Sequence, residues 1–197
     1  MRIILASASP RRKELLRKLF QTFEVIPAKG EECITSGTPS QVVLALSEQK
    51  AKEVEREAAA QDGQEYLVIG ADTLVAANGQ ILGKPRDRQD AAAMLRRLQG
   101  TVHQVYTGVT LLFCHGQGRQ CIQFAECTEV HFYPLSEEEI QAYIHTKEPM
   151  DKAGGYAIQG IGGRFVKRID GDYSNVVGLP VAGIYQRLKE IPAVHFG

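Results

Sequence analysis

The first twelve residues place a short apolar run directly before a proline and two arginines, and that order constrains the fold most. Arg2–Ala6 is apolar enough to predict a buried strand. Pro10 suits the first turn of a helix, where its missing N–H has no partner to lose, so we expect a helix over 10–20. A strand followed by a tight turn and a helix is the repeating unit of α/β folds.

Strands and helices alternate along the rest of the chain. Apolar or alternating runs predict further strands at 23–27, 66–76, 102–114, 120–133 and 164–169. Capping residues or apolar stripes predict further helices at 38–60, 87–98, from Ser136 onwards and at 179–191. Asn78-Gly79 predicts a hairpin, and we interpret 170–180 as a hairpin turn leading into a capped helix. Hairpins among alternating elements indicate an α/β fold with a mixed sheet and flanking helices.

Length and charge limit the classes of protein to consider. A chain of 197 residues fits one domain, or two small lobes that share a cleft. We expect a single domain over 1–197, with any boundary between lobes near residue 135. The 23 basic and 23 acidic residues balance, which argues against a broad nucleic-acid surface. No apolar run approaches the roughly 18 residues that span a bilayer, so we expect no membrane partner and a cytoplasmic location.

The four cysteines do not have the two-residue spacing of a zinc knuckle. Cys121 and Cys127 share one face of a predicted strand, so a metal site with Cys114 and His131 is conceivable. Reduced thiols in a cytosolic protein are the favoured interpretation.

Asp72 is the strongest single candidate for chemistry. It lies inside 66–76, the most hydrophobic strand of the chain. Burying a carboxylate there is costly unless it has a partner or a ligand. We therefore expect Asp72 to be paired or functional, with the hydroxyl of Thr73 beside it available to a ligand.

Several polar groups could bind phosphate. Ser7 and Ser9 offer hydroxyls at the start of the first helix, an anion-binding position, and Arg11 and Arg12 add planar charged groups. A capped helix with two solvated arginines is the alternative. Lys84, between a glycine and a proline, and Lys152, before a glycine pair, could each contact phosphate oxygens or be solvated loop lysines.

Two further segments could contact a nucleotide or its metal ion. Glu31 and Glu32 are either surface charges or, with Asp72, ligands of a divalent cation. Magnesium commonly uses one or two carboxylates together with substrate phosphates. Gln159 lies in the glycine-rich stretch 154–163, where its amide could both donate to and accept from a nucleobase edge, although such glycines also mark simple tight turns.

These pieces, in this order, resemble the Maf family of nucleotide pyrophosphatases. The resemblance runs almost end to end, through LASASPRR at 5–12, EE at 31–32, LSEQKA at 46–51, GADTLV at 70–75, GKPRD at 83–87, YTGV at 106–109, DKAGGYAIQG at 151–160 and DYSNVVGLP at 172–180. It implies a two-lobed mixed α/β fold with a central cleft, related to the inosine triphosphate pyrophosphatases.

The resemblance also implies a reaction, hydrolysis of a nucleoside triphosphate between the α and β phosphates. It implies a magnesium or manganese ion held by Glu32 and Asp72, and a possible homodimer. Asp72 would be the general base or, as the alternative, a metal ligand, with Glu32 and Lys84 as further catalytic residues. The substrate-binding residues would be Ser9, Arg11, Arg12, Lys50, Thr73, Lys152 and Gln159.

The same resemblance points to a substrate. Arg11, Thr73 and Gln159 match the dTTP/UTP branch of the family rather than the branch that prefers 7-methyl-GTP. Modified pyrimidine nucleotides are plausible further substrates. The alternative hypothesis is that the protein is not an enzyme but a regulator of cell division, which senses nucleotides without hydrolysing them.

Overall fold

A computed structural model describes residues 1–31, 36–59, 65–115, 118–191 and 193–196. The elements occur in the order β1 (Arg2–Leu5), α1 (Pro10–Leu16), β2 (Glu24–Val25), α2 (Pro39–Ala59), β3 (Tyr66–Ala77), β4 (Gln80–Leu82), α3 (Arg88–Leu98), β5 (Val102–His115), β6 (Gly118–Phe132), α4 (Glu137–His145), β7 (Val166–Asp170), α5 (Tyr173–Val177) and α6 (Val181–Leu188). Short 3₁₀ turns occupy Glu148–Asp151, Ala153–Gly155 and Ile161–Phe165. Among the described residues, no helix is both long and apolar enough to cross a membrane.

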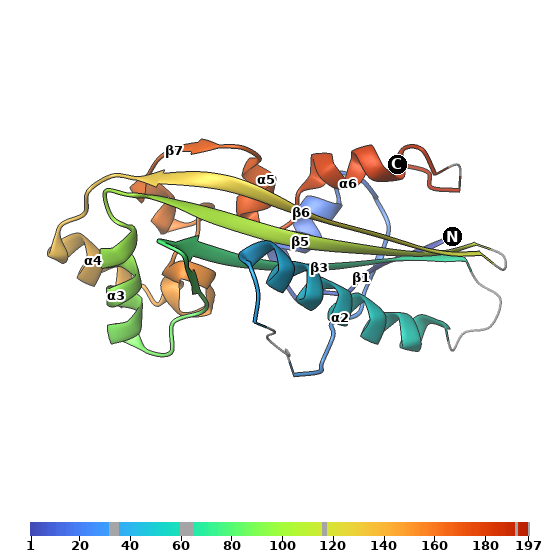
Figure 1. Cartoon of the computed structure of the whole chain (residues 1–197), viewed down its shortest axis with the longest axis horizontal. Helices are drawn as coiled ribbons and strands as arrows, with labels where there is room; N and C mark the ends of the chain where they lie inside the picture. Colours follow the sequence, from blue (N-terminus) through green and yellow to red (C-terminus); the bar gives the residue numbers. More distant parts are fainter. Residues whose placement is uncertain (32–35, 60–64, 116–117, 192, 197) are drawn as a thin grey trace. The chain divides into compact units, whose positions relative to one another are not determined.

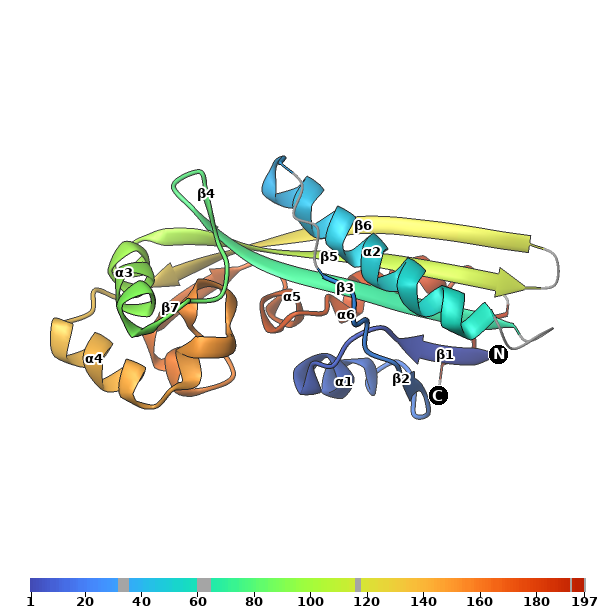
Figure 2. The same cartoon turned by 90° about the horizontal axis from the view of Figure 1, so that it is seen from below.

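The strands form one mixed sheet in the order β2-β1-β3-β5-β6-β7, with β4 paired to β3 (Figure 1 and Figure 2). β1 pairs in parallel with both β2 and β3. β3 pairs antiparallel with β4, and β6 pairs antiparallel with β7. The mixed α/β fold predicted from the alternating elements is therefore confirmed.

The chain divides into two compact units that interleave along the sequence. Unit 1 contains 1–72, 107–126 and 178–197, and unit 2 contains 73–106 and 127–177. The expected boundary near residue 135 is wrong, because β3, β5 and β6 each contribute residues to both units. Because the boundary between the units passes through three strands, no single change in amino-acid composition along the chain marks it. The expected central cleft stays a prediction.

Unit 1 holds β1, β2 and the helices α1, α2 and α6. Figure 2 shows α2 lying along β3. The predicted cap of α2 is confirmed, since Thr38 N–H donates to Gln41 Oε1 at 2.9 Å and Gln41 N–H donates to the Thr38 hydroxyl at 3.4 Å. One apolar cluster of this unit packs Val54 of α2 against strand residues that include Ile4 and Val68.

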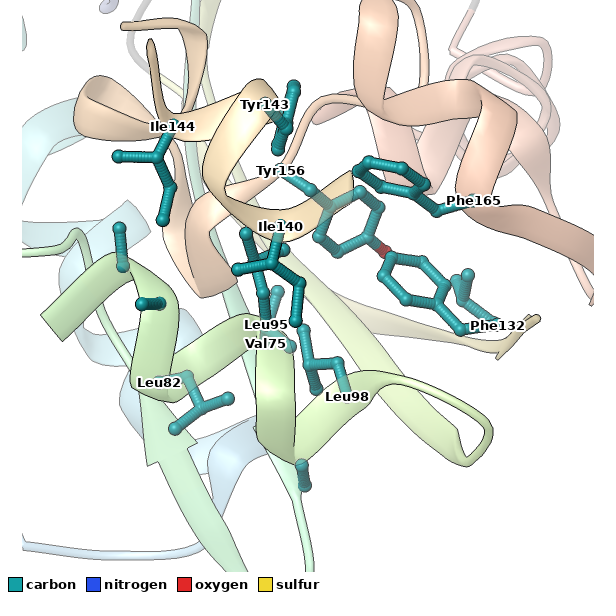
Figure 3. Close-up of a cluster of buried hydrophobic side chains, with 14 of the residues drawn as sticks. Val75, Leu82, Leu95, Leu98, Phe132, Ile140, Tyr143, Ile144, Tyr156 and Phe165 are labelled. Carbon is teal, nitrogen blue, oxygen red and sulfur yellow. The ribbon is translucent and has the colours of Figure 1, made fainter. Parts of the chain in front are cut away.

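Unit 2 has its own apolar core between α3, α4 and the strands beside them (Figure 3). Leu95 and Leu98 of α3 and Ile140 of α4 are almost fully buried in it. Phe132, Tyr156 and Phe165 add edge-to-face and tilted ring contacts. Both predicted helix starts are confirmed here, with Asp87 capping α3 and Ser136 forming a full capping box on α4.

The interpretation of 170–180 is wrong. Tyr173–Val177 forms the short helix α5 instead of a hairpin turn, and no side chain caps α6 at Pro180. Asp172 Oδ1 accepts from the N–H and the hydroxyl of Ser174, both at 2.7 Å, which starts the helical turn. The buried amide of Asn175 then donates to the Val105 carbonyl at 3.0 Å and to the Thr128 hydroxyl at 2.9 Å.

Two of the other boundaries that differ from the sequence prediction lie beside short turns. The first helix ends at Leu16, before a turn in which Leu19 N–H donates to the Leu16 carbonyl. The strand expected from residue 164 begins at Val166, because Ile161–Phe165 first completes a 3₁₀ turn.

Candidate active site

The candidate site in unit 1 begins with an unusually close approach of α2 to β3. A Cβ atom at Gly70 would lie 2.4 Å from the Ser47 carbonyl oxygen, and one at Gly108 would lie 2.3 Å from the Val43 carbonyl oxygen. No side chain fits at either distance, so these glycines allow the helix to lie directly on the strands. The Ser47 and Thr110 hydroxyls, 2.8 Å apart, join the same surfaces.

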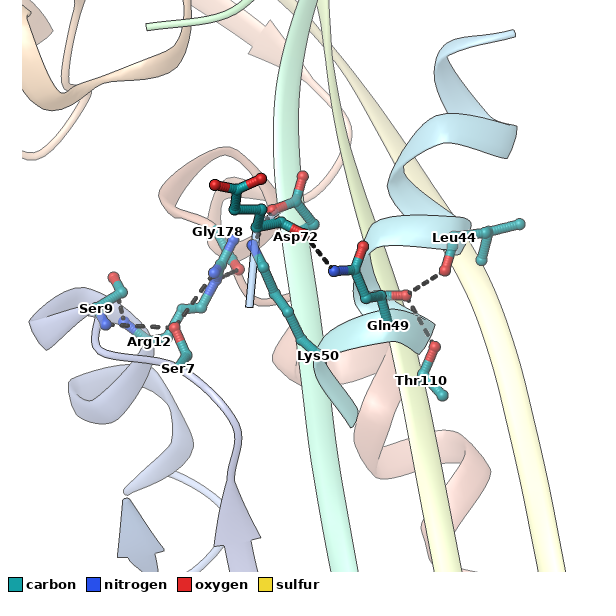
Figure 4. Close-up of polar contacts among 11 residues, drawn as sticks. Ser7, Ser9, Arg12, Leu44, Gln49, Lys50, Asp72, Thr110 and Gly178 are labelled. Atoms are coloured by element: carbon teal, nitrogen blue, oxygen red, sulfur yellow. Dashed lines mark hydrogen bonds and ion pairs between the residues drawn. The ribbon is translucent and has the colours of Figure 1, made fainter. Parts of the chain in front are cut away.

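This close approach brings Lys50 to Asp72. Alternate residues of a strand share a face, so Asp72 points to the same side as Gly70, where α2 lies. Residues three apart share a face of a helix, so Lys50 follows Ser47 on the side of α2 that meets β3. Lys50 Nζ lies 2.5 Å from Asp72 Oδ1, and only 12% of the Asp72 side chain is exposed (Figure 4). The sequence predicts that Asp72 is paired or functional, and its pairing is confirmed.

Arg12 ties the first turn of the chain to the segment before α6. Its Nε donates to the Gly178 carbonyl at 2.8 Å and its Nη1 donates to the Ser7 hydroxyl at 3.3 Å. Ser7 Oγ also accepts from Ser9 N–H at 3.2 Å, while Ser9 caps α1 by accepting from Arg12 N–H (Figure 4). Arg12 therefore shapes the turn as well as adding charge to it, and half-buried Arg11 lies beside it at the start of α1.

Two more residues of α2 hold the loop that leads to the glutamate pair. Glu53 Oε1 accepts from Lys29 N–H at 2.6 Å and from Gly30 N–H at 3.1 Å. Gln49 Nε2 donates to the Glu31 carbonyl at 2.6 Å. Sequence reasoning missed both side chains, although they flank Lys50 on one helix. Glu32, the predicted catalytic and metal-binding residue, lies outside the described residues.

Unit 2 places the segments of the two candidate lysines side by side. Gly154 N–H donates to the Gly83 carbonyl at 3.0 Å, so the loop of Lys84 adjoins the glycine pair that follows Lys152. Lys84 is exposed, and Lys152 forms an ion pair with Asp151. Gly154 has a φ of +70°, and a Cβ there would lie 2.8 Å from Val75 Cγ2, which explains the glycine at this contact.

The remaining candidates of unit 2 lie on β3 and in the glycine-rich stretch. Thr73 is half-buried on β3 and directly follows Asp72, and Gln159 is exposed in a turn. This turn is closed by Gly160 N–H, which donates to the Ala157 carbonyl at 3.1 Å.

A carboxylate that sequence reasoning missed, Glu148, lies beside this turn. Burial alone would raise the pKa of Glu148, but hydrogen bonds from Gly162, Ile161 and Tyr143 and the charge of Lys152 outweigh it and hold that pKa below its usual value. Glu148 is therefore a carboxylate stabilised in its charged form by groups around the turn of Gln159 and by Lys152.

The described residues contain no group of three or more histidine, cysteine, aspartate or glutamate side chains placed to hold a metal ion. The conceivable site of Cys114, Cys121, Cys127 and His131 is therefore not formed, and these three cysteines form no disulfide. A single carboxylate such as Asp72 is still a donor set that suits magnesium bound together with a triphosphate, because the phosphates and water supply the other ligands.

Comparison with known proteins decides the family. The family described as "Maf-like protein" matches residues 2–191. The chain belongs to the Maf-like protein family. A curated relative from Agathobacter rectalis, named dTTP/UTP pyrophosphatase, is 54% identical over 96% of this chain and 97% of its own length. A relative of the same name from Carboxydothermus hydrogenoformans is 50% identical over 96% of this chain and 98% of its own.

Similarity to solved structures is weak. The Staphylococcus aureus Ham1 protein covers 75% of this chain and all of its own at 14% identity, with a TM-score of 0.38. At that score the likeness supports no conclusion about this Maf-like protein, and the expected relation to inosine triphosphate pyrophosphatases rests on the sequence resemblance.

Proposed function

We propose that this Maf-like protein hydrolyses dTTP and UTP to the nucleoside monophosphate and pyrophosphate. The observation that carries the proposal is the 54% identity, over 96% of the chain, to a relative named dTTP/UTP pyrophosphatase. The ion pair of Asp72 and Lys50 supports it, because a largely buried carboxylate with a fixed orientation is suited to activating water.

In this proposal Asp72 is the general base. Lys50 occupies Oδ1 and fixes the carboxylate plane, and we assign Oδ2 to accept the proton of the attacking water. The water oxygen then bonds to the α-phosphorus as the bond from that phosphorus to the bridging oxygen breaks, and pyrophosphate leaves. Because phosphoryl transfer depends mainly on positioning and charge, holding this carboxylate still is one contribution of unit 1 to the proposed reaction.

The positive side chains neutralise the triphosphate. Ser9, Arg11 and Arg12 offer a hydroxyl and two guanidinium groups around the start of α1. Lys84 and Lys152 are proposed to contact phosphate oxygens, with Lys84 as a catalytic residue. Thr73 and Gln159 are proposed to bind the nucleoside.

A divalent cation is part of the proposal. Glu32 would hold magnesium or manganese together with the substrate phosphates, with Asp72 as a further ligand only if it is not the base, and the ion would stabilise negative charge on the departing pyrophosphate. We also propose that the protein acts in the cytoplasm, without a nucleic-acid partner and as a homodimer. The balanced charge of the chain supports the absence of a nucleic-acid partner.

The test is pyrophosphate release from dTTP, UTP, CTP, GTP and 7-methyl-GTP with magnesium or manganese. The proposal predicts that dTTP and UTP are the best substrates. Preference for 7-methyl-GTP would support the proposed hydrolysis but refute dTTP and UTP as the preferred substrates. If the protein bound nucleotides but hydrolysed none of them, this would refute the proposed enzymatic activity and favour a nucleotide sensor.

A further inference from the structure

One carboxylate ties together both ends of the turn that carries Gln159. On the C-terminal side, Ile161 N–H donates to Glu148 Oε2 and Gly162 N–H donates to Glu148 Oε1, both at 3.0 Å. On the N-terminal side, Ala157 N–H donates to the Tyr143 hydroxyl at 3.2 Å. That hydroxyl in turn donates to Glu148 Oε1 at 2.8 Å, so a continuous chain of hydrogen bonds runs from Ala157 to Gly162.

The groups that make this connection are themselves fixed. Tyr143 is fully buried on α4, and its ring meets Phe165 edge to face at 5.0 Å between centroids. Glu148 lies three residues after the end of α4 and begins the 3₁₀ turn that ends at Asp151, next to Lys152. The turn of Gln159 is thus anchored to the body of unit 2 and to the segment that carries a candidate phosphate-binding lysine.

The sequence of the turn is adapted to this carboxylate. A Cβ at Gly160 would lie 2.4 Å from Glu148 Oε2, and a Cβ at Gly162 would lie 2.5 Å from the Tyr143 hydroxyl. These glycines allow the backbone to approach close enough for its N–H groups to reach Glu148. Gln159, between the tied ends, is exposed.

We propose that Glu148 and Tyr143 are positioning residues that hold the 157–162 turn in the conformation in which Gln159 recognises the pyrimidine base. This inference rests on the proposed function. It adds Glu148 and Tyr143 to the residues that determine which nucleobase the protein prefers. Hydrogen bonds to a charged acceptor are among the stronger ones in proteins. Losing one of these hydrogen bonds therefore leaves the turn less ordered. A ligand must then order the turn as it binds, which lowers its affinity.

The first test uses Glu148→Gln, because glutamine keeps the size of the side chain but its amide nitrogen cannot accept from Ile161 or Gly162. Tyr143→Phe removes only the hydroxyl and keeps the ring against Phe165. Glu138→Gln, at an exposed position of α4, and Tyr133→Phe, at an exposed tyrosine, are the matched controls.

We expect Glu148→Gln to raise KM for dTTP and UTP by about tenfold while kcat changes less than about threefold. Selectivity for dTTP over GTP should fall by a similar factor. Tyr143→Phe should act in the same direction by about threefold, since Glu148 keeps both of its backbone donors. Amide hydrogen exchange at Ala157, Ile161 and Gly162 should accelerate in both variants but in neither control.

The affinity of the α,β-methylene analogues of dTTP and GTP, measured by calorimetry, separates this inference from the proposed function. If the folded protein hydrolyses no nucleotide, the proposed enzymatic activity is refuted. The inference about Glu148 still predicts in that case that Glu148→Gln weakens binding of the dTTP analogue about tenfold. Unchanged affinity and selectivity in Glu148→Gln, within twofold of the parent, would overturn the inference, as would a loss of kcat alone.

Discussion

His103 provides a prediction about stability whose size follows from the structure. The imidazole lies on β5 in the core of unit 2 and is 2% exposed. Its Nε2 is 2.8 Å from the Tyr156 hydroxyl, and its ring meets Phe132 edge to face at 4.9 Å. Burial, with a smaller contribution from the charge of His131, lowers the pKa of His103 from 6.5 to about 4.

The sign follows from proton binding in the two states. Between pH 6.5 and about 4, the unfolded chain binds a proton at this imidazole and the folded chain does not, so acid favours unfolding. The contribution is fully present above pH 6.5 and is lost as the pH falls to about 4. The difference between 6.5 and about 4, at about 1.4 kcal/mol per pH unit, corresponds to about 3 kcal/mol. That is a large fraction of the 5–15 kcal/mol typical of a folded protein.

The assay is urea unfolding of the parent and of His103→Gln at pH 7, 6, 5 and 4. Glutamine keeps a polar atom for the Tyr156 hydroxyl but does not titrate. Between pH 7 and pH 4 the parent should lose about 3 kcal/mol more free energy of unfolding than the variant. His145→Gln, at an exposed position of α4, controls for the removal of a histidine in general. Parallel pH profiles of the parent and His103→Gln would show that burial of His103 does not make folding less favourable in acid.

Three further substitutions test other parts of the account. Gly154→Ala should lower the free energy of unfolding by about 2–4 kcal/mol, because it combines a φ of +70° with a contact to Val75; a change below about 0.5 kcal/mol in urea unfolding would contradict this. Asn175→Ala should cost about 2–3 kcal/mol by the same assay, since two buried hydrogen bonds are lost, and a neutral result would show that α5 does not depend on them. Lys50→Met should reduce kcat for dTTP about 10- to 100-fold by releasing the Asp72 carboxylate, and unchanged kcat would show that the ion pair does not orient the base.

Features encoded by neighbouring residues could be predicted from the sequence. Asp87 and Ser136 cap the helices that directly follow them, and Asn78 and Gly79 both adopt the positive φ of a hairpin turn. The short helix at Tyr173–Val177 could not be predicted in this way. It is held by Asn175, whose partners are 70 and 47 residues away in the sequence.

The candidate site shows the same division. The apolar strand around Asp72 indicated that this carboxylate needs a partner, but only the close approach of α2 at Gly70 identifies Lys50 as that partner. Glu148 was missed because its acceptor sites are filled mainly by backbone N–H groups, which every sequence contains. The positions of the glycines at 160 and 162 were the available signal, and their purpose is visible only beside Glu148 and Tyr143.

Asp72→Asn tests whether Asp72 is the base of a pyrimidine triphosphate pyrophosphatase. The measurement is kcat for pyrophosphate release from dTTP, in the parent and the variant, across a magnesium titration. We expect the parent to be active and the variant to lose about 10²- to 10⁴-fold in kcat, with no recovery at high magnesium. Recovery at high magnesium would make Asp72 a metal ligand instead of the base, and a variant that keeps more than about a tenth of the parent's kcat would show that Asp72 is not the base.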